Sequence, residues 1–302
     1  MNGIDGIVLP LPTPFTQDGE VDEAVLRRLV EFEIRGGVHA LFLLGSFGQG
    51  PAMSVEERMR AAEFLMTEIG GRVPVIIHAG TADTPSTIKL ARHAEKLSPA
   101  AIAVVPPYYY THPEHEITAH MMEVASAVSC PVWLYDNPEF TRITVTPEWA
   151  ARLAQEIPTL SGIKVAFADL DTLMSYVYTL PPRVRVYAGG ITSLLPCAPL
   201  GVKGAIHPPT SAFPEVCVAY WDAIQRRDWP RAFALHEALS EASVTMRKAG
   251  RLFGRSAQAE MFRLRGLTIH RYPRWAARPV SPEMREELRK TADSLLAELG
   301  ND

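Results

Sequence analysis

Lys164 is the residue of this chain whose surroundings most clearly suggest chemistry. It lies within the apolar run Leu160–Phe167, which is typical of a buried β-strand. Lysine is almost never fully buried unless it is paired or chemically used, and a desolvated amine becomes a nucleophile toward carbonyl carbon. These residues alone leave two interpretations open: a buried nucleophile, or a lysine outside a central strand whose flexible stem carries the ammonium to solvent.

A glycine-containing segment, Gly45-Ser-Phe-Gly-Gln49, follows another apolar run and has the features of a small-anion site. Glycine lets the chain turn so that successive backbone N–H groups converge, and Ser46 adds a hydroxyl donor. The alternative is an ordinary glycine turn that binds no ligand.

Two tyrosine-containing segments and one histidine supply groups that can carry protons. The segments are Pro106-Pro-Tyr-Tyr-Tyr110 and Tyr135-Asp-Asn-Pro138, and the histidine is His207. Each has a structural alternative. The tyrosine triplet can be loop or interface packing, Tyr135 can be a strand-end aromatic with a backbone partner, and His207 can be a strand-end histidine bonded to the backbone.

Together these groups suit one reaction type. A neutral lysine amine attacks the ketone of a 2-oxo acid and forms an iminium ion, which then serves as an electron sink for a carbanion at the adjacent carbon. A nearby phenol can transfer protons during the addition. The substrate carboxylate needs fixed donors but neither a metal nor an organic cofactor, and the histidines show no metal-ligand spacing.

The elements that must position these groups alternate between apolar runs and helical patterns. The runs are apolar throughout, which is typical of parallel strands covered on both faces. They are Gly6–Leu11, Ala40–Leu44, Val73–His78, Ala101–Val105, Val132–Tyr135, Leu160–Val165, Val184–Ala188 and Gly204–His207.

This alternation predicts an α/β fold in which residues 1–212 form a closed (β/α)8 TIM barrel. An open doubly wound sheet is the competing architecture, but no Gly-x-Gly-x-x-Gly turn follows the first strand. In a barrel, residues at the C-terminal ends of the strands carry the chemistry. The segments named above would therefore meet at one rim.

Residues 213–302 are predicted to form a helical region that packs on the barrel. Helices are expected over Pro214–Arg227, Trp229–Ala249, Arg255–Leu264 and Pro282–Leu299, with an arginine- and proline-containing loop before the last. That last helix keeps one apolar face.

Composition excludes several other classes. The chain has 302 residues, is 47% hydrophobic and 21% charged, and carries a formal net charge of −4, which argues against a basic nucleic-acid surface. No apolar run approaches the roughly 20 residues that span a bilayer, and the N-terminus does not read as a secretory signal. Three widely separated cysteines give no disulfide framework and fit the cytoplasm.

Four segments in order resemble the dihydrodipicolinate synthase / N-acetylneuraminate lyase family of class I aldolases. They are Gly45-Ser-Phe-Gly-Gln49, Pro107-Tyr-Tyr109, Tyr135-Asp-Asn-Pro138 and Gly162-Ile-Lys164. The resemblance runs from about Gly6 to the C-terminus.

The resemblance implies a role for each matching residue. Lys164 would be the Schiff-base lysine, Tyr135 the proton-relaying phenol, and Ser46 with the amide of Phe47 would bind the pyruvyl carboxylate. Tyr109 would complete a hydroxyl relay by reaching into the site of a neighbouring subunit. The resemblance also implies a homotetramer built as a dimer of dimers.

Departures from the family pattern bear on the substrate. Phe47 replaces a hydroxyl residue, Gln49 replaces the usual glutamate, and Phe140 stands where the synthase branch has arginine, with Arg142 two positions further on. The stretch 189–193 lacks the carboxylate of the sialic-acid branch. We expect Phe47, Phe140, Gly189 and His207 to line a distal pocket for a substrate less polar than sialic acid.

The sequence therefore predicts a Schiff-base-forming lyase, an aldolase or dehydratase, acting on pyruvate or a 2-keto-3-deoxy acid through Lys164. The alternatives are 4-hydroxy-tetrahydrodipicolinate synthase, a non-catalytic family member that binds a 2-oxo acid, and a phosphate-binding barrel enzyme. The last would need a glycine-rich anion site after the seventh and eighth strands, where Ala188-Gly-Gly190 is the only hint.

Overall fold

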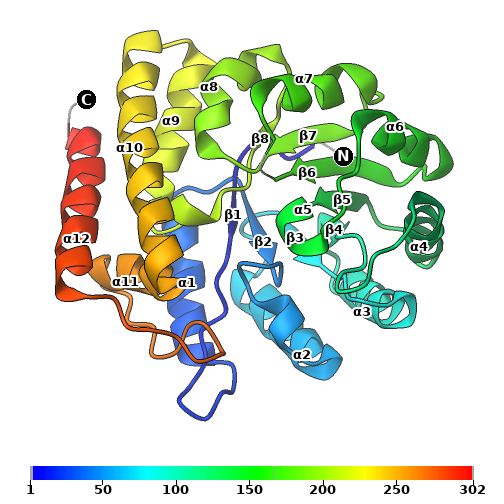
Figure 1. The fold of residues 1–302 in the computed structure, drawn as a ribbon, viewed down its shortest axis with the longest axis horizontal. Coiled ribbons are helices and arrows are strands. Elements are labelled where there is room, and N and C mark those ends of the chain that lie inside the picture. The colour runs from blue at the N-terminus through cyan, green and yellow to red at the C-terminus, as the bar shows by residue number, and fades with distance from the viewer. Residues whose placement is uncertain (1–2, 167, 301–302) are drawn as a thin grey trace.

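Eight parallel strands close into a barrel in the computed structural model, which describes residues 3–166 and 168–300 (Figure 1). Each strand pairs with its neighbours in chain order, and β1 also pairs with β8. The strands are β1 Gly6–Pro10, β2 Ala40–Leu43, β3 Val75–His78, β4 Ala101–Val104, β5 Val132–Asp136, β6 Leu160–Val165, β7 Arg185–Ala188 and β8 Gly204–Ala205. The predicted TIM barrel is confirmed, and the open doubly wound sheet is wrong.

Buried side chains on both faces of the strands explain why these runs are apolar throughout. Alternate residues point into the barrel, where the Trp133 and Tyr187 rings stack with their centroids 4.4 Å apart. The intervening residues, such as Ile163 and Val165 of β6, pack against the surrounding helices. Lys164 lies between Ile163 and Val165 in this strand, and its side chain therefore belongs to the inner face.

Helices follow the strands around the outside of the barrel (Figure 1). Several of their N-termini carry side-chain caps; the Ser54 side chain, for example, accepts from the Glu57 amide while Glu57 accepts from the Ser54 amide. The helices between strands are α1 Glu23–Arg35, α2 Val55–Ile69, α3 Thr84–Lys96, α4 Glu114–Ser126, α5 Pro138–Thr141, α6 Pro147–Glu156, α7 Leu170–Thr179 and α8 Leu194–Cys197.

The eighth strand is shorter than predicted. It ends at Ala205 rather than His207 because the chain turns into a proline-containing 3-10 helix, Pro208–Thr210. A side chain on Gly204 would place its Cβ 1.9 Å from the Gly6 carbonyl oxygen, so only glycine allows this close pairing with β1. Phe167, the last residue of the sixth apolar run, lies outside the described residues.

The chain beyond the last strand is helical, with α9 Pro214–Arg226, α10 Trp229–Phe253, α11 Ser256–Leu264 and α12 Pro282–Ala297. Helix α9 packs on β1, while α10 and α12 lie side by side at one edge of the molecule with α11 against both (Figure 1). The division of the chain at residue 212 stays a prediction. Among the described residues, no helix is both long and apolar enough to cross a membrane.

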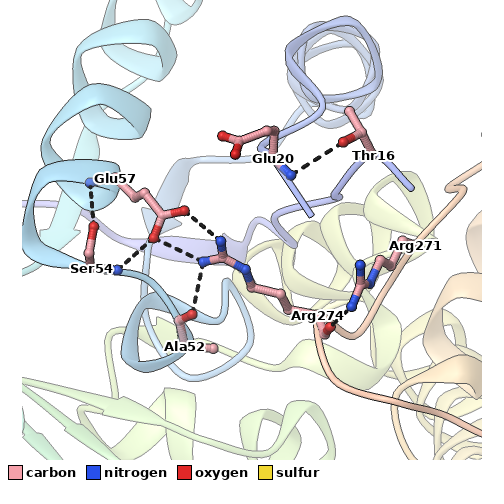
Figure 2. Close-up of polar contacts among 7 residues, drawn as sticks. All are labelled: Thr16, Glu20, Ala52, Ser54, Glu57, Arg271 and Arg274. Atoms are coloured by element: carbon pink, nitrogen blue, oxygen red, sulfur yellow. Dashed lines mark hydrogen bonds and ion pairs between the residues drawn. The ribbon is translucent and has the colours of Figure 1, made fainter. Parts of the chain in front are cut away.

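The loop between α11 and α12 returns to the barrel rim. Arg274 in this loop forms an ion pair with Glu57 at the start of α2 and donates to the carbonyl of Ala52 at 3.0 Å (Figure 2). The C-terminal segment is thereby held against the loop that follows β2, where the anion site is predicted.

Candidate active site

Lys164 is buried in the barrel, with 4% of its surface exposed. Its ammonium nitrogen lies 4.2 Å from the centre of the Tyr135 ring and 5.1 Å from that of Phe42. Tyr135 and Lys164 are register partners on neighbouring strands β5 and β6. Lys164 forms no ion pair with any carboxylate of the described residues. The interpretation of a solvent-reaching lysine is therefore wrong, and the buried amine lies against two aromatic rings.

The hydroxyl of Tyr135 connects the lysine to the predicted anion loop. It lies 3.0 Å from the Ser46 hydroxyl, and it accepts a hydrogen bond from the Asn137 amide nitrogen at 2.7 Å. Because Asn137 donates, the phenol oxygen retains its own proton for Ser46 or a ligand. Sequence reasoning included Asn137 in a motif but gave it no role.

The backbone of the segment Gly45–Gln49 folds into a tight loop at the rim. Leu44 and Gln49 both have left-handed backbone conformations, with φ of 59° and 56°. A Cβ on Gly50 would lie 1.9 Å from the Leu44 carbonyl oxygen, so glycine is required where the loop closes. Among the described residues, the amides of Phe47 and Gly48 donate no hydrogen bond, and Phe47 lines the larger cavity.

Three residues of the C-terminal segment fix this loop. The guanidinium of Arg255 donates to the Ser46 carbonyl at 2.8 Å, and the Tyr272 hydroxyl donates to the Phe47 carbonyl at 2.7 Å. The backbone amide of Arg274 donates to the Gln49 side-chain oxygen at 2.8 Å. Gln49 therefore supports the loop from behind, where its side chain is buried.

Arg255 is the residue that sequence reasoning missed most clearly. Its guanidinium stands over the rings of Phe47, Tyr272 and Trp275, each within 6 Å of the ring centre. No local pattern indicated this, because the contact to Ser46 spans 209 positions. The arginine- and proline-containing loop that supplies Tyr272 and Trp275 was the only available signal.

Two adjoining cavities open beside these groups. The larger, of about 460 Å³, is lined by Lys164 and by all the other predicted site residues except Tyr109, namely Ser46, Phe47, Tyr135, Phe140, Gly189 and His207. The second, of about 330 Å³, has a mainly apolar surface and shares with the first the residues Ser46, Tyr135, Asn137, Phe140, Arg255 and Trp275. The site is roomy enough for a ligand larger than pyruvate.

Tyr109 lies away from both cavities. Its side chain is 86% exposed, its φ is +85°, and its ring packs edge-on against Tyr110. The hydroxyl relay is therefore not completed by the Tyr109 of the same chain, which agrees with its expected reach toward a neighbouring subunit without testing it.

His207 and Gly189 both line the larger cavity. Burial, followed by the positive charges of Lys164 and Arg247, lowers the pKa of His207 to about 3, and its Nδ1 lies 3.1 Å from the Thr210 hydroxyl. The imidazole is therefore neutral at physiological pH, and its partner is a side chain rather than the backbone. A Cβ on Gly189 would lie 2.7 Å from the Ala166 Cα, so only glycine fits there.

Phe140 stands at the mouth of both cavities with 52% of its surface exposed. Arg142, two positions later, is exposed and lines neither cavity, so it does not replace the arginine of the synthase branch in this arrangement.

The dihydrodipicolinate synthetase family is matched over residues 3–295 of the chain. The chain belongs to this family. A 4-hydroxy-tetrahydrodipicolinate synthase of Salinibacter ruber is 35% identical over 209 residues, or 69% of each chain. A protein of Escherichia coli named as a probable 2-dehydro-3-deoxy-D-pentonate aldolase is 33% identical over 79% of this chain and 80% of its own.

Solved structures agree with this family membership. One of them is YagE, a prophage protein of the dihydrodipicolinic acid synthase family from Escherichia coli, which was solved in complex with pyruvate. It matches this chain with a TM-score of 0.89 and 29% sequence identity, over 97% of this chain and 98% of the YagE chain. The dihydrodipicolinate synthetase family relatives are named as synthases and aldolases. The present chain is accordingly a lyase of that family.

Proposed function

We propose that this chain forms a Schiff base between Lys164 and a 2-oxo acid and then cleaves a carbon–carbon or carbon–oxygen bond of that substrate. One observation carries the proposal. The Lys164 amine is buried, forms no ion pair with a carboxylate of the described residues, and lies beside the Tyr135 ring in a cavity of about 460 Å³. The name of the aldolase relative and the pyruvate complex of YagE support it.

The first step is binding of the substrate carboxylate. The Ser46 hydroxyl and the amide of Phe47 are donors for it, and Arg255 and Tyr272 hold their loop in place from behind. Preorganised donors of this kind cost no rearrangement when the substrate arrives. The ketone carbon is then presented to the Lys164 amine.

The second step is formation of the iminium ion. The amine adds to the ketone carbon to give a carbinolamine, and the Tyr135 phenol supplies a proton as the hydroxyl leaves as water. The Ser46 hydroxyl, 3.0 Å from that phenol, can return the proton. In retro-aldol cleavage, the resulting C=N⁺ accepts the electron pair of the carbon–carbon bond beyond the adjacent carbon. In dehydration, it accepts the electron pair of a C–H bond on the adjacent carbon as that proton is removed, and the enamine so formed expels the hydroxyl group with its bonding pair, which takes up a proton. Retro-aldol cleavage releases an aldehyde, whereas dehydration releases water.

We expect the active assembly to be a homotetramer in which Tyr109 of one subunit reaches the site of its neighbour. The exposure of Tyr109 and Tyr110, at 86% and 66%, supports a contact outside the chain itself. We also expect the cytoplasm as the compartment, because the cysteines Cys130, Cys197 and Cys217 are free thiols.

4-Hydroxy-tetrahydrodipicolinate synthase is the second candidate, favoured by the name of the Salinibacter ruber relative. It needs a group that binds the carboxylate of aspartate semialdehyde. Phe140 occupies that position here, and Arg142 lines neither cavity. A coupled assay with pyruvate and aspartate semialdehyde separates the two candidates.

The direct test of the proposal is to trap the intermediate. The protein is incubated with pyruvate, reduced with borohydride and digested, and the mass adduct is expected on the peptide that contains Lys164. The Lys164→Arg variant should give no adduct, whereas Lys203→Arg should react like the native protein. An adduct on another lysine, or none, would contradict the mechanism.

A further inference from the structure

Helix α10 contributes two polar residues to the wall of the larger cavity, Ser243 and Arg247. They are four positions apart and therefore lie on one face of the helix. Neither belongs to the set that sequence reasoning assigned to the site. The four family motifs include no residue of this helix and therefore do not indicate what this face binds.

Ser243 is buried, with 3% of its surface exposed. Its hydroxyl oxygen has no hydrogen-bond partner among the described residues. A helical serine usually satisfies its hydroxyl by bonding to the carbonyl of the preceding turn, as Ser240 does to the His236 carbonyl at 2.7 Å. Ser243 thus lines the cavity with a hydroxyl that has no partner and whose oxygen, in this side-chain conformation, is covered.

Arg247 is an exposed residue that lines the larger cavity. Within the described residues its guanidinium forms no ion pair, whereas its neighbour Lys248 pairs with Glu287 at 2.7 Å. Besides the Lys164 amine, which becomes a positively charged iminium in the proposed mechanism, the described residues of the cavity wall include two guanidinium groups, Arg247 and Arg255, and one carboxylate, Glu139. A chain with a formal net charge of −4 therefore concentrates positive charge in this cavity.

His207 lines the same cavity as Lys164 and Arg247. The charges of both Lys164 and Arg247 act on its imidazole and lower its pKa, after the larger effect of burial. Because Lys164, His207 and Arg247 all line this cavity, a ligand that is attached to Lys164 and fills the cavity comes close to Arg247. The hydroxyl residues Thr192 and Ser193 line the same cavity and offer further hydrogen bonds along it.

We propose that Ser243 and Arg247 form a subsite for a carboxylate at the far end of the substrate, so that the preferred substrate is a 2-oxo acid with a second, terminal carboxylate. This inference rests on the proposed Schiff-base function of Lys164. One guanidinium with a hydroxyl suits a carboxylate, and Glu139 on the same wall disfavours the larger charge of a phosphate. The apolar pocket that the sequence predicts around Phe140 therefore corresponds to the mouth of the site. The wall formed by α10 is polar instead.

The test uses Schiff-base trapping, because trapping does not depend on whether cleavage follows. The full-length protein is titrated with 2-oxoadipate and with 2-oxohexanoate, which differ only in the terminal carboxylate, and then reduced with borohydride. The shorter pair, 2-oxoglutarate and 2-oxopentanoate, tests the effect of length. The concentration that half-saturates the adduct on Lys164 is measured for each.

We compare each dicarboxylate with its matched monoacid. For the better dicarboxylate, we expect the half-saturating concentration to be about 10- to 100-fold lower than for the monoacid, which is the effect of a charge-assisted hydrogen bond. Arg247→Leu should abolish that difference and leave the monoacid and pyruvate unchanged. Ser243→Ala should reduce it by a smaller factor. Arg251→Leu, an exposed arginine on the same helix that does not line the cavity, should reproduce the native values.

The outcomes separate this inference from the proposed function. If pyruvate labels Lys164 but the diacids show no advantage, or keep it in Arg247→Leu, the subsite is overturned and the Schiff-base function stands. If pyruvate gives no adduct on Lys164, the function itself falls. A 2-oxo acid with a terminal phosphate that half-saturates below the diacids would overturn the assignment of a carboxylate.

Discussion

The hydroxyl oxygens of Ser46 and Tyr135 lie 3.0 Å apart, although 89 positions separate the two residues. One hydroxyl belongs to the loop after β2, and the other belongs to β5 beside the amine of Lys164. The contact links the predicted carboxylate site to the predicted proton carrier. In the proposed mechanism, this contact provides a path for a proton between substrate, serine and phenol that needs no bulk water molecule.

Removing the phenol should slow catalysis more than binding. We expect Tyr135→Phe to lower kcat by about 10²- to 10⁴-fold, the usual contribution of a general acid–base group. Ser46→Ala should also raise KM, because it removes a carboxylate donor. The double variant should lose less than the product of the two single effects, since both residues act in one relay. Steady-state kinetics of pyruvate release measures this, and full multiplicativity would contradict a shared relay.

Tyr109 should act across a subunit interface. Tyr109→Phe and Lys164→Arg should each have low activity alone, but mixed tetramers should regain part of it, because some sites then combine an intact Lys164 with a neighbour's intact Tyr109. Unfolding and refolding the two variants together, with activity and mass measured by light scattering, provides the test. Mixed tetramers that stay inactive would place the role of Tyr109 elsewhere.

The barrel was predictable because its signal is local and repeated. Each strand is a short apolar run that is buried on both faces, and the barrel could be inferred without knowing any long-range contact. The limits of that signal appear at β8, where two residues, Gly204 and Ala205, are all that pair. Close approach of backbones, rather than apolar side chains, holds that strand, and this leaves little trace in a hydrophobic pattern.

The site was predictable where its residues end strands and not where they come from the C-terminal segment. Lys164 and Tyr135 could be assigned because a barrel brings strand ends to one rim. Arg255, Ser243 and Arg247 lie on helices or their ends, and only the packing of α10 and α11 brings them to the cavity. Helical periodicity gives the buried face of such a helix but not the element that it faces.

Arg255 should position the anion loop without touching the reacting atoms. We expect Arg255→Gln to raise KM for pyruvate by about 10-fold or more, because it removes charge-assisted bonds to the Ser46 carbonyl and the Tyr272 hydroxyl. The value of kcat should change less. Arg255→Lys should recover only part of the loss, since an ammonium lacks the planar fork. Arg251→Gln is the matched control and should leave both constants unchanged.

The ion pair between Glu57 and Arg274 should make stability depend on pH in the acid range. Arg274, together with the Ser54 amide, lowers the pKa of Glu57 to about 2 (Figure 2). Because this pKa is lower in the folded state, the stabilisation is complete above the ordinary value near 4.5 and is lost as the pH falls toward 2. We expect Glu57→Gln to cost about 2 kcal/mol at pH 7 and little near pH 2. Denaturant unfolding at several pH values measures the difference, and a constant difference would contradict this role.

Glu33 should have the opposite effect. It lies in α1 with none of its surface exposed, and neither carboxyl oxygen has a hydrogen-bond partner among the described residues. Burial, reinforced by the charge of Glu215 and opposed by that of Arg265, raises the pKa of Glu33 well above its ordinary value. The folded state therefore keeps the proton that the unfolded chain releases, so the native protein loses stability as the pH rises through and beyond the unfolded value. We expect Glu33→Gln to gain about 0.5–2 kcal/mol at pH 8 and less at pH 4.5. Glu23→Gln, at an exposed position of the same helix, should show no such dependence, and a Glu33→Gln effect that is equal at both pH values would contradict the buried protonated carboxyl.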